Sequence, residues 1–189
     1  MSASATTPLP SVTLGPDPAE ASGELWVLHG AFGRGRNWHG WARQWVEQTR
    51  WRAVLVDLPG HGAATSTRTE PSLEACAAVL ARTVEQSPGA APRALLGHSL
   101  GGKVALASLD RTGTCEPAPW QAACVVDVPP GPRDPGGAAW RMLSRLRRSP
   151  GPFASRDEGR QSLELDGLSP AVAAWMAMNL AREADGWRW

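Results

Sequence analysis

Residues 94–102 read Ala-Leu-Leu-Gly-His-Ser-Leu-Gly-Gly, an apolar run that ends in Gly97-x-Ser99-x-Gly101 and continues into a helix-forming stretch. This pattern is typical of a sharp strand-to-helix turn that lifts a serine hydroxyl above the end of a sheet. Glycines leave no Cβ where such a turn brings two backbone segments together, and the serine takes a strained backbone conformation. Ser99 is therefore a candidate covalent nucleophile, and the rest of the chain has to provide its partners.

Other apolar runs have the continuous hydrophobicity of strands that are covered on both faces. With 94–96 they are 25–28, 53–56 and 122–126, and helices are predicted at 37–48, 72–86 and 100–109, with Asn37 and Ser72 as N-caps. Strands that alternate with helices through short connections predict an α/β fold with a mostly parallel sheet. Ligands bind such sheets at the carboxyl ends of the strands, where each candidate functional residue of this chain lies.

The chain is expected to have three parts. Residues 1–23 are predicted to be a loose N-terminal arm with one short strand near Val12–Leu14, and residues 24–131 to be the α/β core. After a Pro- and Gly-rich linker, residues 132–189 are predicted to be a helical cap, with helices at 138–148, 157–165 and 170–183. Ser169 and Pro170 mark the start of the last helix.

Composition excludes several classes of protein. The 189 residues are 42% hydrophobic and carry a formal charge of +1, which favours neither a nucleic-acid partner nor an acidic substrate. No apolar run approaches the ~20 residues needed to span a bilayer. Cys76, Cys115 and Cys124 fall into no metal-like spacing and suit reduced thiols. We expect an intracellular monomer, cytoplasmic or organellar, without cofactor or metal.

Four segments together resemble the α/β-hydrolase superfamily, and in particular its abhydrolase domain-containing 11 and YbfF-type esterase group. They are residues 28–33 (Leu-His-Gly-Ala-Phe-Gly), 97–103, 126–129 (Val-Asp-Val-Pro) and 179–183. The resemblance covers residues 24–189. It implies that the protein hydrolyses acyl esters or thioesters and that its substrate is a small molecule.

The resemblance implies a role for individual residues of this chain. Ser99 would attack the acyl carbon, and the backbone N–H of Leu100 would bind the developing oxyanion. A second donor would come from Ala31, with Phe32 close by. Asp127, at the end of the strand after Ser99, would be the acid of the triad.

Alternatives to these assignments remain open. Asp57 is a second candidate carboxylate, and many members of the superfamily use an acid one strand later, in sequence that this chain lacks. In similar enzymes the histidine of the His29-Gly30 turn braces the loop.

The base of the triad is missing from its expected place. A serine hydroxyl is a poor nucleophile until an imidazole takes its proton, and in this fold the histidine follows the acid along the chain. All four histidines, His29, His39, His61 and His98, precede Ser99. We therefore expect a C-terminally truncated chain that lacks its last strands and has little or no activity.

Two further interpretations of function remain. One is a non-catalytic module of this fold that binds an acyl ligand or a partner, and the other is a carbon–carbon bond hydrolase or lyase. In each case the apolar side chains of Trp140, Trp175 and Met176 are predicted to contact the substrate. Simple core packing is the competing role for these three.

Overall fold

The computed structural model describes residues 7–67, 69–89, 92–112, 120–131 and 137–189. The chain divides into two compact units, Met1–Pro130 and Gly131–Trp189. Within the described ranges, no helix is both long enough and apolar enough to cross a lipid bilayer.

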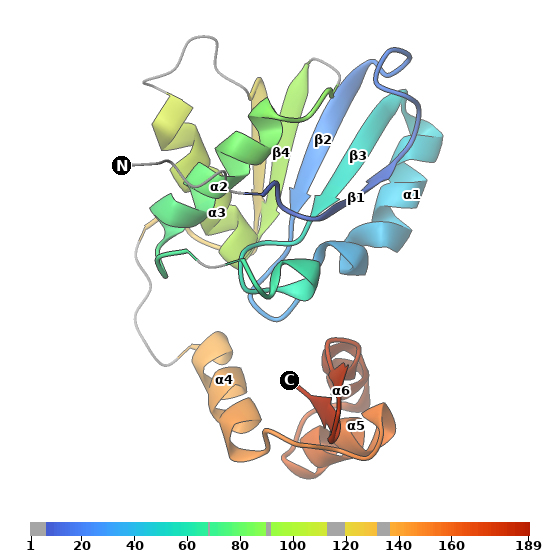
Figure 1. The fold of residues 1–189 in the computed structure, drawn as a ribbon, viewed down its shortest axis with the longest axis vertical. Coiled ribbons are helices and arrows are strands. Elements are labelled where there is room, and N and C mark those ends of the chain that lie inside the picture. Colours follow the sequence, from blue (N-terminus) through green and yellow to red (C-terminus); the bar gives the residue numbers. More distant parts are fainter. Residues whose placement is uncertain (1–6, 68, 90–91, 113–119, 132–136) are drawn as a thin grey trace. The chain divides into compact units, whose positions relative to one another are not determined.

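A five-stranded sheet in the order β1-β3-β2-β4-β5 forms the centre of the first unit (Figure 1). The strands are β1 (Ser11–Leu14), β2 (Gly23–Leu28), β3 (Trp51–Val56), β4 (Arg93–His98) and β5 (Ala122–Val126). Strands β2 to β5 run parallel to their neighbours, and β1 alone pairs antiparallel, with β3. The predicted α/β fold with a mostly parallel sheet is confirmed.

The N-terminal segment is not a loose arm over its described length. The short strand expected near Val12–Leu14 is present, and its residues from Ser11 onward pair with β3. Leu9 is buried, and its N–H donates to Oγ1 of Thr83 at 3.0 Å. This segment therefore satisfies one edge of β3, whose backbone groups would otherwise be unpaired.

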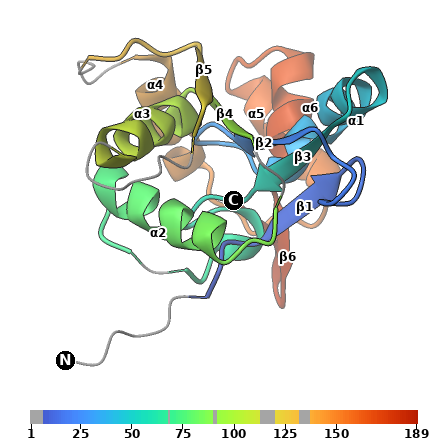
Figure 2. The same ribbon diagram turned by 90° about the horizontal axis from the view of Figure 1, so that it is seen from above.

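Helices cover both faces of the sheet (Figure 2). On one face lies α1 (His39–Gln48), and on the other lie α2 (Leu73–Glu85) and α3 (Leu100–Thr112). Because successive strand residues point to opposite faces, β2 sends Trp26 toward α2 and α3 and Val27 toward α1.

The two predicted N-caps have different outcomes. Ser72 caps α2 as expected, since its Oγ accepts from the N–H of Ala75 at 3.1 Å. Asn37 does not cap α1. It lies in a 3₁₀ turn, Gly35–Trp38, where its Oδ1 accepts from the N–H of Arg34 at 2.7 Å.

A charged group is buried at the amino end of the sheet. Glu24 on β2 is fully buried, and its carboxylate accepts from Nε1 of Trp26 at 2.7 Å. Nε of Arg93, on β4, lies 3.2 Å from it, and Nε of Arg52, on β3, lies 3.4 Å away. The two guanidinium groups offset the desolvation of the carboxylate and tie three neighbouring strands together.

The second unit contains helices and a small hairpin. Its elements are α4 (Ala138–Arg148), α5 (Arg156–Leu165), α6 (Pro170–Ala177), β6 (Ala181–Glu183) and β7 (Gly186–Arg188). The helix predicted to reach Glu183 ends at Ala177, because β6 turns back to pair with β7. The small core consists of Phe153, Ala177 and Leu180, with Trp187 and Trp189 packed against it.

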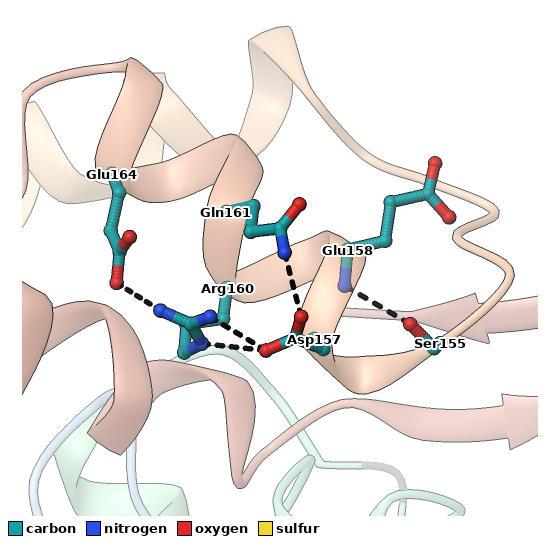
Figure 3. A network of polar contacts seen from close by, with 6 residues as sticks. All are labelled: Ser155, Asp157, Glu158, Arg160, Gln161 and Glu164. Carbon is teal, nitrogen blue, oxygen red and sulfur yellow. Dashed lines mark hydrogen bonds and ion pairs between the residues drawn. The ribbon is translucent and has the colours of Figure 1, made fainter.

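Polar contacts along α5 fix the start and the exposed side of this helix (Figure 3). Oγ of Ser155 accepts from the N–H of Glu158 at 3.1 Å and so caps the helix. One turn further on, Arg160 pairs with Asp157 at 2.7 Å and with Glu164. Exposed pairs of this kind contribute little to stability, so α5 depends mainly on its cap and its buried side.

Candidate functional site

Ser99 lies in the turn between β4 and α3, with a backbone φ of +52°. Its N–H donates to the carbonyl of Val126 at 2.9 Å, and its own carbonyl accepts from Lys103 at 3.1 Å. A φ in this left-handed region costs a non-glycine residue on the order of 1 kcal/mol or more, and the surrounding structure must hold it there.

The glycines on either side of Ser99 are required by close backbone approach. A Cβ at Gly101 would lie 2.7 Å from the carbonyl oxygen of His29, and a Cβ at Gly97 would lie 2.7 Å from Cα of Gly102. The N–H of Gly101 also donates to the His29 carbonyl at 3.1 Å. The turn is therefore docked directly on the loop that follows β2.

That loop and the loop after β3 are tied together by three side chains. Asp57, from the loop after β3, accepts from the N–H of Gly35 at 2.7 Å and from that of Ala63 at 2.8 Å. His61 places Nε2 at 2.8 Å from the carbonyl oxygen of Ala31 and Nδ1 at 3.0 Å from that of Pro59.

The third side chain that joins the two loops is His29, which lies in the loop after β2 and bonds to the loop after β3. Its Nε2 accepts from the N–H of Leu58 at 3.0 Å, so the proton of the neutral ring lies on Nδ1 and is donated to the Gly30 carbonyl at 2.8 Å. Burial lowers the pKa of His29 to about 4, and the nearby ring of His61 acts in the same direction. His29 is thus a neutral structural brace and is not available as a base near pH 7.

Two backbone N–H groups beside Ser99 remain without an acceptor among the described residues. The Gly30 carbonyl accepts from the His29 ring and from the N–H of Gly33 at 3.0 Å. Because a trans peptide points its N–H opposite its carbonyl, these bonds direct the N–H of Ala31 away from them. At the start of α3, the N–H of Leu100 has no preceding turn to bond to.

The loop and the serine lie close together, since a Cβ on Gly30 would be 3.4 Å from Cβ of Ser99. Ala31 and Leu100 thus have the features of an anion-binding pair. Phe32, the other predicted donor, follows the Ala31 carbonyl that His61 holds.

Asp127 lies directly after β5 and also has a left-handed backbone, with φ of +56°. Its side chain is 79% exposed, and Oδ2 is 3.7 Å from Nε2 of His98, the residue before Ser99. The ring of His98 lies 6.0 Å from that of Trp38. The structure therefore places Asp127 at the strand ends beside the serine turn, where sequence reasoning missed its contact with His98.

Two other titratable residues, His39 and Asp57, differ from Asp127 in their surroundings. His39 is exposed at the start of α1. Asp57, the alternative carboxylate, accepts hydrogen bonds from the backbone N–H groups of Gly35 and Ala63. The sequence of residues 57–62 (Asp-Leu-Pro-Gly-His-Gly) indicated a turn. It contains no signal for the hydrogen bond between His61 and the carbonyl of Ala31.

The predicted substrate contacts all lie in the second unit. Trp140 on α4 is 50% exposed and Trp175 on α6 is 37% exposed, whereas Met176 is buried, at 1% exposed. A cavity of about 530 Å³ in the first unit is lined by Leu25, Trp45 and other residues near the amino ends of the strands, so it contains neither Ser99 nor Asp127. Among the described residues, no three His, Cys, Asp or Glu side chains are grouped as a metal site.

Comparison with known proteins identifies the family. The chain belongs to the α/β-hydrolase family, whose sequence model matches residues 27–189. It is 36% identical over 121 residues to the mouse (Mus musculus) sn-1-specific diacylglycerol lipase ABHD11, covering 64% of this chain and 37% of that protein. It is also 39% identical over 82 residues to a 2-succinyl-6-hydroxy-2,4-cyclohexadiene-1-carboxylate synthase of Pectobacterium atrosepticum, covering 43% of this chain and 30% of the synthase.

Solved structures share the fold. A marine microorganism esterase superposes with a TM-score of 0.77 at 23% identity, over 96% of this chain and 67% of the esterase. The thioesterase domain from the curacin biosynthetic pathway superposes with a TM-score of 0.63 at 22% identity, over 95% of this chain and 66% of the thioesterase domain. The chain thus spans about a third of the length of these curated relatives and about two thirds of these structures.

Proposed function

We propose that this chain carries the acyl-transfer site of a serine hydrolase that cleaves carboxylic ester or thioester bonds. One observation carries the proposal. Ser99 is held in a left-handed turn at the end of β4, next to two backbone N–H groups, of Ala31 and Leu100, that have no acceptor among the described residues. A serine beside unpaired donors fits a reaction in which a hydroxyl attacks a carbonyl and negative charge develops on its oxygen.

In the proposed reaction, Oγ of Ser99 attacks the acyl carbon and gives up its proton to a base. The carbonyl oxygen becomes an oxyanion that accepts from Ala31 and Leu100, with Phe32 as the neighbouring donor. When the carbonyl re-forms, the alcohol or thiol leaves and takes a proton, and the acyl group remains on Ser99. Water then repeats the attack and releases the acid.

The proposed acid is Asp127, which would orient a base and stabilise its charged form. Residues 100–189 contain no histidine, and the rings of His29 and His61 are engaged with backbone groups of their loops. We therefore expect residues 1–189 alone to turn over ester about 10⁴ to 10⁶ times more slowly than a complete triad would.

The names of the relatives support an acyl substrate. Esterases and a thioesterase share the fold, and the mouse relative is named a diacylglycerol lipase. Trp140 and Trp175 expose apolar side chains on the second unit, and contact of these side chains with an acyl group stays a prediction.

Covalent labelling tests the proposal. The chain is incubated with an alkyl fluorophosphonate, which phosphonylates an activated serine, and the modified residue is located by mass spectrometry. We expect slow labelling at Ser99 that is lost in Ser99→Ala and kept in the control Ser144→Ala, an exposed serine on α4. Equal labelling of the Ser99→Ala variant would show that Ser99 is not the nucleophile.

A non-catalytic acyl-binding module is the second candidate, favoured by the missing histidine. It predicts no labelling of Ser99 but measurable binding of an alkyl trifluoromethyl ketone to both the unaltered chain and Ser99→Ala. A carbon–carbon bond reaction at the same serine is the third candidate, because the chain is similar to the synthase. A carbon–carbon bond that the unaltered chain forms or cleaves in a test substrate, and that Ser99→Ala does not, would favour it.

A further inference from the structure

The backbone on either side of Asp127 is docked on the first turn of α3. Before it, the carbonyl of Val126 accepts from the N–H of Ser99 at 2.9 Å. After it, a Cβ at Gly102 would lie 2.7 Å from Cγ1 of Val128, so this valine packs directly against the helix. The carboxylate of Asp127 is itself 79% exposed. The place of the proposed acid therefore depends on its backbone.

The two residues that follow Val128 can accept hydrogen bonds but cannot donate them. Pro129 and Pro130 have carbonyl oxygens and no N–H, and a proline cannot continue the ladder of a strand. Water can satisfy these carbonyls wherever the segment lies. A fixed position for the segment therefore requires a donor from elsewhere in the chain.

Lys103 provides this donor. Its Nζ lies 2.6 Å from the carbonyl oxygen of Pro129 and 3.2 Å from that of Pro130. Lys103 lies one helical turn after Ser99, since its N–H donates to the Ser99 carbonyl at 3.1 Å. Long side chains on a helix point back toward its amino end. This direction brings the ammonium group to the carboxyl ends of the strands, where the segment after Asp127 lies.

Lys103 is also the one lysine of the sequence. All the other residues among the 19 basic ones are arginines. An ammonium is a compact group with three donors, whereas a guanidinium is planar and longer. The single ammonium of the chain thus lies where two successive carbonyls converge on a compact donor.

The backbone conformation of Asp127 requires support of this kind. Its φ of +56° is in the left-handed region, and a non-glycine residue stays there only when the surrounding structure holds it. The bond from Ser99 lies on one side of Asp127, and the bonds from Lys103 lie on the other. Both come from the first turn of α3.

We propose that Lys103 is a positioning residue for Asp127 in the hydrolase reaction. Its ammonium links the segment after Asp127 to the helix that begins beside Ser99, so the backbone of the acid keeps a fixed place relative to the nucleophile. The carboxylate stays free to turn toward a base. The role in the reaction rests on the proposed function, whereas the link itself is made by groups between Ser99 and Pro130 and does not.

Nuclear magnetic resonance of the chain with ¹⁵N-labelled lysine tests the link. Because the sequence has one lysine, it gives one side-chain ammonium signal. At neutral pH, exchange with water broadens such a signal beyond detection unless hydrogen bonds protect the protons. We expect a visible signal in the unaltered chain and in Asp127→Asn, which keeps both proline carbonyls. A signal that is absent from the unaltered chain would overturn the proposal.

The ring of His98 reports the position of Asp127, because its Nε2 lies 3.7 Å from Oδ2. Asp127→Asn removes the charge and so measures the part of the His98 ring shift that is due to the carboxylate. We expect Lys103→Met to cause about half of this shift or more, and to add little to it in the double variant, as coupled residues do. Lys103→Arg keeps a charged donor and should stay close to the unaltered chain.

Arg43→Met is the matched control. It removes one positive charge from an exposed pair with Glu47 on α1 and should leave the His98 signal in place. The proposal is overturned if Lys103→Met leaves that signal unchanged, or if its effect simply adds to that of Asp127→Asn. Circular dichroism verifies the fold of each variant, and the ammonium signal of the unaltered chain tests the link even where a variant does not fold.

None of these measurements uses the reactivity of Ser99. Failure of fluorophosphonate labelling would therefore contradict the proposed hydrolase and leave the link in place. Failure of the resonance measurements would remove the link and leave the labelling of Ser99 as expected.

Discussion

The two sides of Ser99 are built very differently. On one side, the loops after β2 and β3 are joined by His29, His61 and Asp57, each of which bonds to the backbone. On the other side, the carboxylate of Asp127 is 79% exposed, and its Oδ2 lies 3.7 Å from Nε2 of His98. The side that would stabilise an oxyanion is rigid before any substrate arrives, while the side that would move a proton is open.

This difference has a physical basis. Backbone donors can stabilise developing charge well only when they are aimed in advance, because reorganising them during the reaction would cost energy. An acid that serves a histidine gains its position from that histidine, and none follows Asp127 in this chain. The rigid side can thus form without the open one.

The largest expected effect is on the docking of the serine turn against the rigid side. Gly101→Ala puts a Cβ against the carbonyls of Leu28 and His29, and we expect the free energy of unfolding to fall by more than about 3 kcal/mol. Gly40→Ala, in α1 with nothing near the added Cβ, should instead gain up to about 1 kcal/mol. Urea denaturation measures both, and equal stability of the two variants would contradict the close approach.

Acid should weaken the rigid side through His29. Its pKa is about 4 in the folded chain and about 6.5 when unfolded, so the unfolded state takes up a proton that the folded state does not. The contribution is fully present above pH 6.5, and about 3 kcal/mol of it is lost as the pH falls toward 4. Urea titrations across this range should show a smaller loss for His29→Gln. An identical pH dependence in that variant would assign the effect to other groups.

Two aspartates compare the sides directly. Asp57→Ala leaves the N–H groups of Gly35 and Ala63 without their charged acceptor, and we expect a loss of about 2 kcal/mol. Asp127→Ala should change the free energy of unfolding by less than about 0.5 kcal/mol, because the carboxylate is exposed and its contact with His98 is long. The comparison fails if thermal melting shows a larger loss for Asp127→Ala.

The serine turn and the strands were accessible to sequence reasoning because both depend on local pattern. Gly97-x-Ser99-x-Gly101 after an apolar run predicts the turn, and continuous apolar runs predict buried parallel strands. The contact of His61 with Ala31 joins residues 30 positions apart, and no periodicity records it. The last helix was predicted too long because Ala181–Glu183 has helical composition, whereas pairing with Gly186–Arg188 decides its structure.

The smallest expected effect on stability comes from backbone strain, which is present at Ser99 and at Asp127. Ser99 and Asp127 have φ of +52° and +56°, a region that glycine occupies without penalty. Ser99→Gly should raise the free energy of unfolding by about 1 kcal/mol, as strain is released. Ser87→Gly, at a position without positive φ, should lower it by a few tenths. Chemical denaturation of the pair measures the difference, and no gain for Ser99→Gly would mean the turn is unstrained.

The buried Glu24 has a consequence for how the chain assembles during synthesis. Its partner Arg93 follows it by 69 residues, so the ribosome releases β2 and β3 well before β4 exists. Until then one of the two cations that offset the carboxylate is absent, and burying β2 would leave that charge poorly compensated. We therefore expect the sheet to form late and in a single step, when β4 pairs with β2. Until then β2 and β3 are expected to stay hydrated and unpacked.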